Sequence, residues 1–439
     1  MGNPSMYKIG QYFNTFEITR GLLITIALSA FIYLHHWNLS YPLINTLLGV
    51  LGIYFLLSSD RRVWFWSGAF IGLFWFWWIV ISFKHYQMLW AIPLALLFIA
   101  LGYGLIFWFI AYLSEKCAQI CNKVFPKLLP TLHSLLPLTL KSLGVLSLSY
   151  IHPFGFDWLK PELIFVESYL GIQKWQFALI LFAIVLSQWK QRHAYLFLIL
   201  FAYHPTTVQT VEHPSDIALI STYISVEDKW DKRLQPEHFK TFFAKIDEAI
   251  EKKKRLVILP ESVFPLFLNY SPLLDELQKR AKEIDIVTGG LYADGKIPRN
   301  STYIFRGEHI LVSNKVVLVP FGESNPLPDF LSDWVNEVFY DGAVDYIASA
   351  DITDYTIGDK TYRNAICFEA TSEKLYEGSP ARMIVLSNNG WFVPSTEPTL
   401  QKLLLLYYHK KYGTTIYHSV NMSPSYIIKE GMIFSVGAE

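Results

Sequence analysis

The chain has 439 residues and carries 37 basic and 37 acidic residues, so its formal net charge is zero. Only 17% of its residues are charged, against roughly 25% in average soluble proteins, and 52% are hydrophobic. The balanced charge, without a long basic block, argues against a nucleic-acid-binding protein. Long apolar runs gather within residues 18–204, whereas residues 205–439 have the composition of a soluble domain. We therefore expect a transmembrane domain over 1–204 and a second domain over 205–439.

Seven apolar segments of the first part are candidate membrane spans. A helix needs about 20 mostly apolar residues to cross the hydrocarbon core. The candidates are 18–37, 41–58, 63–83, 88–113, 131–151, 175–188 and 193–204. The first span is longer than a typical signal-peptide core, and no small-residue cleavage site follows it, so we expect it to remain in the protein. The sequence thus predicts a membrane domain of about seven helices.

Basic residues alternate between the loops and so predict an orientation, because Lys and Arg mark the cytoplasmic side of a membrane protein. They lie at or before the start of the first span and in every second loop: Lys8, Arg20, Arg61, Arg62, Lys116, Lys123, Lys127, Lys190 and Arg192. The other loops are poor in basic residues. With seven crossings, the N-terminus is expected on the cytoplasmic side of the membrane and residues 205–439 on the opposite side.

Two features of the membrane part have more than one interpretation. The loop His152–Leu159 is rich in aromatic residues, which favours a membrane-dipping element beside the second domain, although core packing explains it equally well. Cys117 and Cys121 form a Cys-x3-Cys pair, which is weak evidence for a metal and is better read as structural. The spacing of His, Asp and Glu suggests no metal site, and we expect no cofactor.

Strands and helices alternate in the second part, after a linker at 205–214. Strands are expected at 216–226, 255–259, 285–288, 302–305, 310–313, 362–367 and 383–387, and helices at 236–253 and 271–282. The strand 285–288 is expected to end at the pair Gly289-Gly290. Arg255–Leu259 is continuously apolar, as in a strand that is covered on both faces. This alternation predicts stacked sheets covered by helices.

Four polar side chains directly follow predicted strands: Glu261, Lys315, Cys367 and Asn388. Sites of α/β proteins usually lie beyond the carboxyl ends of strands. Each residue alone is weak evidence, but together they supply a base, a cation and a thiol. Cys367 is the only cysteine of the second part. Outside the cytoplasm a structural cysteine normally has a disulfide partner, so a lone thiol there favours a nucleophile.

At these residues the chain resembles the nitrilase superfamily, whose active site is a Glu-Lys-Cys triad. More narrowly, it resembles the family of bacterial apolipoprotein N-acyltransferases. The matching stretches are Leu259-Pro260-Glu261-Ser262, Lys315-Val316-Val317-Leu318-Val319-Pro320-Phe321-Gly322-Glu323, Ile366-Cys367-Phe368-Glu369 and Ser387-Asn388-Asn389-Gly390-Trp391-Phe392, with Pro398 and Gln401 downstream and Trp230 upstream. The resemblance covers nearly the whole chain, since this family also places a multi-span membrane domain before a periplasmic catalytic domain.

The resemblance implies a fold, a reaction and a set of roles. The fold is an αββα sandwich behind the helical membrane domain. The reaction moves an acyl chain from a phospholipid to the N-terminal amine of a diacylated apolipoprotein through a thioester on Cys367. Glu261 serves as base and Lys315 as the cation. The resemblance gives Glu323, Phe368 and Glu369 supporting roles, and Trp230, Asn388, Trp391 and Phe392 roles in substrate binding.

The chain also departs from the family pattern. Phe368 stands where the family usually has Tyr, Asn389 stands where it has Asp, and a final membrane helix is missing before Glu439. None of these changes removes a member of the triad. A membrane-tethered amidohydrolase of the nitrilase type remains an alternative, because water and an amine attack the same thioester. A membrane binding or transport protein with a degenerate enzyme domain is a third interpretation, which the intact triad disfavours.

Overall fold

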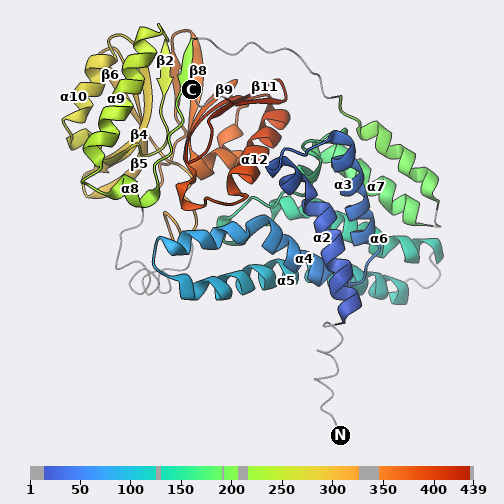
Figure 1. Cartoon of the computed structure of the whole chain (residues 1–439). Coiled ribbons are helices and arrows are strands. Elements are labelled where there is room, and N and C mark those ends of the chain that lie inside the picture. Colours follow the sequence, from blue (N-terminus) through green and yellow to red (C-terminus); the bar gives the residue numbers. More distant parts are fainter. Residues whose placement is uncertain (1–13, 125–129, 190–191, 206–215, 326–345, 436–439) are drawn as a thin grey trace. The chain divides into compact units, whose positions relative to one another are not determined.

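The computed structural model describes residues 14–124, 130–189, 192–205, 216–325 and 346–435 (Figure 1), without the side chains of 130–134. Lys8, Lys127, Lys190 and most of the expected linker at 205–214 lie outside the described residues. The chain divides into two compact units. The helical unit comprises Met1–Ile151, Leu159–Thr206 and Pro394–Leu403, and the sheet unit comprises His152–Trp158, Thr207–Val393 and Leu404–Glu439. Neither unit is one continuous segment. Residues 152–158 interrupt the helical unit and belong to the sheet unit, and residues 394–403 interrupt the sheet unit and belong to the helical unit.

Helices occupy each range for which the sequence predicts a membrane span. They are α2 (Thr15–His36), α3 (Pro42–Leu57), α4 (Arg61–Phe76) with η1 (Trp77–Lys84), η2 (Leu89–Ala91) with α5 (Ile92–Val124), α6 (Pro130–Ser147) with η3 (Leu148–Tyr150), α7 (Lys174–Gln188) and η7 (His193–Ala202). The local sequence explains where several of these helices begin. Asn14 caps α2 by accepting the Phe16 N–H, Pro42 begins α3, and Asp60 caps α4 through the N–H groups of the first turn.

Three stretches of the described chain are long and apolar enough to cross a membrane: Thr15–His36, Arg61–Lys84 and Leu89–Val124. The remaining apolar helices are shorter. Large apolar side chains of the helical unit are also exposed in the described part of the chain. Leu94, Leu97 and Phe98 of α5 are between 54% and 60% exposed. A soluble protein rarely leaves such a stripe in water, whereas lipid chains cover it at no cost.

Small residues bring α4 and α5 close together. A Cβ atom on Gly68 would lie 2.6 Å from both the Phe107 Cβ and the Tyr103 carbonyl oxygen, and one on Gly72 would lie 2.7 Å from the Tyr103 ring. Real Cβ atoms do not approach other atoms so closely. The Gly68-x3-Gly72 spacing therefore forms the surface against which α5 packs, as small residues do between helices in membranes.

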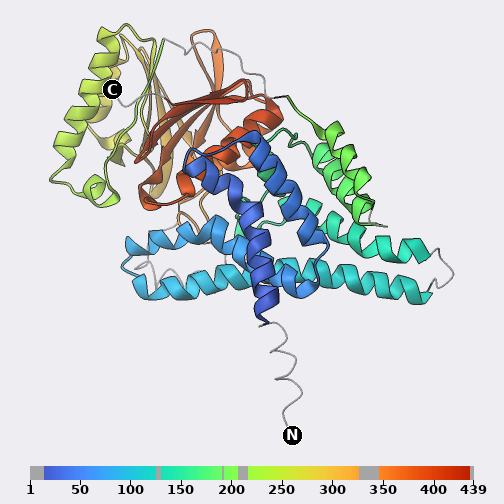
Figure 2. The same cartoon turned by 45° about the vertical axis from the view of Figure 1, so that its right-hand side comes forward.

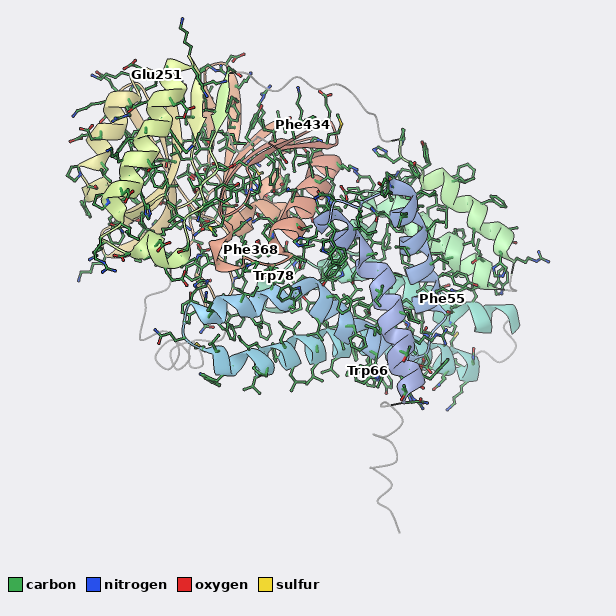
Figure 3. The ribbon with its side chains drawn as sticks, in the orientation of Figure 1. Phe55, Trp66, Trp78, Glu251, Phe368 and Phe434 are labelled. Carbon is green, nitrogen blue, oxygen red and sulfur yellow. The ribbon has the colours of Figure 1, made fainter. Side chains whose placement is uncertain are left out.

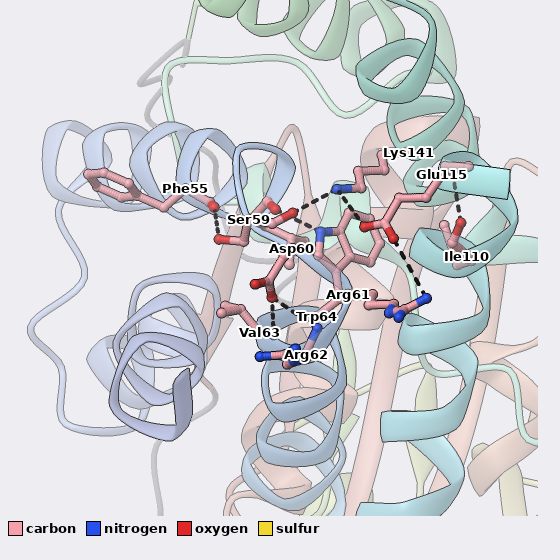
Figure 4. A network of polar contacts seen from close by, with 12 residues as sticks. Phe55, Ser59, Asp60, Arg61, Arg62, Val63, Trp64, Ile110, Glu115 and Lys141 are labelled. Carbon is pink, nitrogen blue, oxygen red and sulfur yellow. Dashed lines mark hydrogen bonds and ion pairs between the residues drawn. The ribbon is translucent and has the colours of Figure 1, made fainter. Parts of the chain in front are cut away.

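A polar network compensates the charge of Lys141 within the helical unit (Figure 4). Lys141 Nζ donates to the Ser59 carbonyl at 2.7 Å and lies 3.9 Å from a Glu115 carboxylate oxygen. Arg61 reaches the other Glu115 oxygen at 4.0 Å. The ammonium also lies 5.9 Å from the centre of the Trp64 ring. A lysine in an apolar segment lowers the stability of the protein unless its charge is paired. Here a carbonyl, a carboxylate and an aromatic ring together stabilise the ammonium.

The first sheet of the sheet unit has the strand order β1-β2-β4-β5-β6, with β3 added beside β4. Its strands are β1 (Ile217–Leu219), β2 (Leu256–Ile258), β3 (Phe264–Phe267), β4 (Asp285–Asp294), β5 (Ile297–Arg306) and β6 (His309–Asn314). β1, β2 and β4 are parallel, whereas β4, β5 and β6 form an antiparallel meander. The expected pair of strands around Gly307 is therefore confirmed as β5 and β6.

The second sheet has the strand order β12-β11-β10-β9-β8-β7. Its strands are β7 (Asp354–Ile357), β8 (Lys360–Ile366), β9 (Arg382–Asn388), β10 (Thr415–Asn421), β11 (Tyr426–Lys429) and β12 (Met432–Ser435). The central strands β8, β9 and β10 are parallel, so their carboxyl ends meet at one edge. β10, β11 and β12 were not among the strands expected from the sequence.

The two sheets face each other and are covered by helices on their outer sides. Buried residues of both sheets share one core, in which Ile258 and Val287 of the first sheet meet Tyr362 and Leu386 of the second. Helices α9 (Gln235–Glu251) and α10 (Leu273–Arg280) cover the other face of the first sheet, and the buried residues 403–408 of α12 (Glu397–Tyr412) belong to the layer beyond the second (Figures 1 and 2). The expected αββα architecture is confirmed.

Two local expectations were wrong. The stretch 216–226 is not one strand, because β1 ends at Leu219 and a short helix, α8 (Val226–Trp230), begins where Ser225 caps it. Strand β4 does not end at Gly289-Gly290 but continues to Asp294. Glycine inside a strand often marks the close approach of another backbone, and the next section shows which backbone approaches here.

Candidate active site

The three residues of the expected triad lie in the sheet unit, each just after a strand. Glu261 follows β2, Lys315 follows β6 and Cys367 follows β8. Cys367 itself has a φ angle of 54°, a left-handed conformation that a residue other than glycine rarely adopts. This bend ends β8 and begins the 3₁₀ turn η9 (Cys367–Thr371). Strain of this kind concentrates at functional positions, and it presents the thiol at the edge of the sheet.

A chain of polar contacts joins Glu261 to Lys315. The side-chain amide of Asn300, on β5, donates to Glu261 Oε1 at 2.8 Å and to Glu323 Oε1 at 2.9 Å. The other oxygen of Glu323 forms an ion pair with Lys315 Nζ at 2.7 Å and accepts the Val319 N–H at 2.9 Å. One amide thus bridges two carboxylates, and the second carboxylate holds the lysine.

Glu369 fixes the segment that carries Lys315 against the end of β8. One of its carboxylate oxygens accepts the N–H groups of Val316 and Val317, at 2.7 and 3.1 Å. The other accepts the Ile366 N–H at 2.7 Å. Val316 follows Lys315 and Ile366 precedes Cys367, so this buried carboxylate positions the lysine and the thiol through their main chains. Backbone N–H groups that converge on a carboxylate form strong, charge-assisted bonds.

Burial dominates the electrostatics of this site. It raises the pKa of Glu261, with Lys315 acting in the opposite direction and Glu323 adding to the rise. Burial likewise raises the pKa of Glu369 to about 7, against the effects of Lys315 and the three N–H donors. For Lys315, burial alone would lower the pKa, but Glu323, Glu261, Cys367 and Glu369 together raise it above its ordinary value. Lys315 therefore stays protonated, while Glu261 is a stronger base than an exposed carboxylate.

Gly289 lies directly against the main chain of Glu261. A Cβ atom at this position would lie 2.5 Å from the Ser262 nitrogen and 2.7 Å from the Glu261 Cα. The clash would be with backbone, which cannot move aside as a flexible side chain can. Gly289 also donates its N–H to the Pro260 carbonyl at 3.3 Å. The absence of a side chain at Gly289 therefore lets β4 pass directly beside the main chain of Glu261 and sets the position of Glu261.

An aromatic stack covers the residue after the thiol. Phe368, labelled in Figure 3, stacks on Phe156 and Trp158 with ring centroids 5.8 and 6.0 Å apart. The Trp158 indole N–H donates to the Thr371 hydroxyl at 2.7 Å, and that hydroxyl donates to the Phe368 carbonyl at 2.6 Å. The segment 152–158 belongs to the sheet unit, so this part of the aromatic loop packs beside the candidate nucleophile.

The residues expected to bind substrate have different surroundings. Trp230 ends α8 and is 45% exposed. Asn388 ends β9 and is buried; its Oδ1 accepts the Gly390 N–H at 3.2 Å and the Asn421 side-chain amide at 2.7 Å. Trp391 and Phe392 follow it and are partly buried. A role in substrate binding remains a prediction for all four. The Asn388 side chain already bonds to Gly390 and Asn421 and so holds the chain after β9 in place.

Sequence reasoning missed Asn300 and Gly289. The available signal for Asn300 was the polar run Asn300-Ser301-Thr302, which lies inside a strand and is buried. For Gly289 the signal was a glycine pair after a continuously apolar strand. Neither signal names a partner, because the sequence does not reveal which backbone or carboxylate lies opposite.

The arrangement has what acyl transfer through a thiol needs. It places a buried carboxylate, a protonated lysine and a thiol at the ends of strands from two facing sheets. All three cysteines of the chain are thiols. Among the described residues, no group of three or more His, Cys, Asp or Glu side chains could hold a metal ion.

Comparison with known proteins agrees with this chemistry. Residues 15–206 match the model of the apolipoprotein N-acyltransferase integral membrane domain. The apolipoprotein N-acyltransferase of Wolinella succinogenes is 40% identical over 409 residues, which cover 92% of this chain and 94% of that protein. The chain belongs to the apolipoprotein N-acyltransferase family. It is thus an acyltransferase with an integral membrane domain.

Other apolipoprotein N-acyltransferases are also similar over most of their length. That of Helicobacter pylori is 32% identical and covers 89% of this chain, which in turn covers 88% of it. Among solved structures, a CN-hydrolase superfamily protein of Xanthomonas campestris has a TM-score of 0.39 at 12% identity, and covers 51% of this chain and 87% of its own. An amidase of the nitrilase superfamily from Nesterenkonia has the same TM-score and identity, and covers 52% of this chain and 89% of its own.

Proposed function

We propose that this acyltransferase moves an acyl chain from a phospholipid to the N-terminal amine of a diacylglyceryl-modified apolipoprotein, in two steps through a thioester on Cys367. The observation that carries the proposal is the network around Lys315. Glu323 and Asn300 link its ammonium to Glu261, and Glu369 links its main chain to the end of β8, directly before Cys367. Membership of the family supports the choice of acceptor, since the relatives are named for it.

In the first step Glu261 takes the proton of the Cys367 thiol, and the thiolate attacks the ester carbonyl carbon of the phospholipid. Lys315 stabilises the thiolate and the oxyanion that forms. The bond between the carbonyl carbon and the glycerol oxygen then breaks, and Glu261 returns its proton to that oxygen. A lysophospholipid leaves and the acyl group stays on sulfur. A donor aimed at such an oxyanion is typically worth about 10² to 10³ in rate.

In the second step the amine of the apolipoprotein attacks the thioester carbon. Glu261 takes a proton from the attacking nitrogen, the carbon–sulfur bond breaks, and the proton passes to the thiolate. An amide and a free thiol result. The aromatic side chains beside Cys367 suit an acyl chain, and Trp230, Trp391 and Phe392 are candidate contacts. Both substrates are anchored in the bilayer, which accounts for an integral membrane domain on the same chain.

We also propose a location. The helices of residues 1–204 cross the bacterial inner membrane several times, and the sheet unit with Cys367 faces the periplasm. The alternation of basic residues between loops supports this orientation. On intact spheroplasts, a membrane-impermeant thiol reagent should label Cys367 and spare Cys117 and Cys121. The reverse labelling pattern would overturn the orientation.

The decisive experiment is to trap the thioester. The purified full chain is incubated with a phospholipid that carries a labelled acyl chain, and mass spectrometry should find the label on Cys367 and on no other residue. Adding a diacylated lipopeptide should then move the label to the peptide amine. The Cys367→Ala variant should show neither event. Label released only as free fatty acid would instead favour an amidohydrolase, and full activity of the alanine variant would exclude the mechanism.

A further inference from the structure

A second lysine lies at the active site, and the triad does not use it. Lys229 is on the helix α8, next to Trp230, and only 4% of it is exposed. Its Nζ donates to the main-chain carbonyl of Glu261 at 3.3 Å. Its charge also interacts with the Glu261 carboxyl and with Cys367. One buried ammonium is thus coupled to both the base and the nucleophile.

The surroundings of Lys229 do not explain its burial as a structural ion pair. Within the described part of the chain, Lys229 Nζ donates to the Glu261 carbonyl, and no carboxylate forms an ion pair with this ammonium. An ammonium has three N–H donors, so two of them have no protein acceptor there. Burial of a charge without such a partner costs stability, and it is usually retained for a function.

The charges of the site show what that function is. Three carboxyls belong to the site: Asn300 donates to Glu261 and Glu323, and Glu369 holds the main chain directly before Cys367. Lys315 is the cation tied to them, and its ammonium is already paired with Glu323. When Glu261 takes the proton of the Cys367 thiol, negative charge moves from the carboxylate to the sulfur within this buried site. A second cation beside the sulfur offsets that charge, and Lys229 is coupled to the sulfur and to Glu261.

We propose that Lys229 is a second active-site cation, which holds the main chain of Glu261 and shares with Lys315 the stabilisation of the Cys367 thiolate. Lys229 acts through Glu261 and Cys367, so it is a positioning and charge-balancing residue. The proposal rests on Cys367 being the nucleophile of the proposed function. Burial lowers the pKa of Lys229 to about 8, against the opposing effects of Glu261 and Cys367, so the side chain is still mostly charged at neutral pH.

The test is the pH dependence of Cys367 alkylation, which needs no lipid substrate. The full chain in detergent, with Cys117 and Cys121 changed to Ser, is reacted with iodoacetamide over a range of pH. Because the thiolate is the reactive form, the midpoint of the rate profile reports the pKa of the thiol. Two variants remove the charge: Lys229→Gln keeps an N–H donor for the Glu261 carbonyl, and Lys229→Met removes it. Lys232→Met, an exposed neighbour, is the matched control.

We expect both Lys229 variants to move the midpoint upward by about one pH unit, and the alkylation rate near pH 7 to fall about tenfold, because a nearby opposite charge shifts a pKa by about that much. The control should follow the parent. A Lys229→Gln protein whose profile matches the parent would overturn the charge-balancing role, whatever Lys229→Met does. If the parent forms no thioester with labelled phospholipid, the proposed function fails, while the alkylation profile still decides the role of Lys229.

Discussion

In the helical unit, charged side chains form small separate groups. Glu17 contacts Arg62 at 3.0 Å, and Glu162 pairs with Lys174 and accepts the Ser149 hydroxyl. In the sheet unit, one network of hydrogen bonds and charge interactions includes Cys367 and joins Glu261, Glu323, Glu369, Lys315 and Lys229. A separate pair satisfies itself and keeps helices in place. A cluster whose charges are not matched one by one keeps its pKa values shifted, which is what proton transfer and a reactive thiol require.

The largest expected effect comes from the cation at the centre of the cluster. In Lys315→Met, the ammonium that pairs with Glu323 and interacts with Cys367 is lost. We expect the rate of thioester formation to fall by about 10³, because both the thiolate and the oxyanion lose their main stabilising charge. Single-turnover acylation with labelled phospholipid measures this rate, and Lys296→Met, an exposed lysine, is the control. An unchanged rate would remove Lys315 from the mechanism and would make the cluster structural.

Glu397 is an exception to the pairing seen in the helical unit. It is buried in the first turn of α12, and its Oε2 has no hydrogen-bond partner in the described chain. Burial raises its pKa from 4.5 to about 8. A raised pKa means that the folded state holds the proton more tightly than the unfolded state, so this contribution to stability is complete below pH 4.5 and is lost as the pH rises towards 8.

Glu397→Gln removes this pH dependence. The variant should be more stable than the parent by about 2–3 kcal/mol at pH 7, and the difference should shrink towards pH 4.5. Apparent melting temperatures of the full chain between pH 5 and 8 measure the effect, with the exposed Glu251→Gln as control. Parallel curves for parent and variant would show that Glu397 is ionised and paired like the other charges of its unit.

The amide bridge within the cluster predicts a smaller change. Asn300 lowers the pKa of Glu261 by donating to its carboxylate. In Asn300→Leu that donor is lost and Glu261 faces Glu323 without a bridge, so the pKa of Glu261 should rise. The acid limb of the acylation rate, which needs ionised Glu261, should therefore move to higher pH by about one unit. Asn269→Leu, which loses bonds to the main chain of Ala293 alone, should leave the limb in place.

Lys141→Met probes the helical side of the comparison and should have the smallest effect. The variant loses the donor to the Ser59 carbonyl and a contact with Glu115, which keeps Arg61 as a neighbour. We expect a loss of about 1 kcal/mol in stability, seen as a lower melting temperature, and an unchanged rate of thioester formation. Lys123→Met is the exposed control. A slower acylation step would mean that charge in the helical unit is linked to catalysis.

Several parts of the structure follow from the sequence. The stacked sheets covered by helices follow from alternating apolar strands and amphipathic helices, and α9 agrees with its expected range within two residues. The position of Glu261, Lys315 and Cys367 after strands also follows, because a change from apolar to polar residues marks where a strand leaves the core. The strand β10 was missed, since Thr415–Asn421 contains His418 and Asn421, which become acceptable in a buried strand only through their partners Ser387 and Asn388.

The sequence by itself determined which chemical groups are present: a carboxylate, a lysine and the single thiol of residues 205–439, in an acyltransferase with an apolar helical part. These depend on residue type and local pattern, which a single segment carries. Only the tertiary structure decided how that chemistry is assembled. Four features join segments far apart in the chain: the bridge from Glu261 through Asn300 to Glu323, the close approach of Gly289, the bonds of Glu369 to the Lys315 segment and to the end of β8, and the burial of Lys229. Such contacts form only when the sheets pack together. A local sequence pattern does not reveal which distant residue packing will place beside a given side chain.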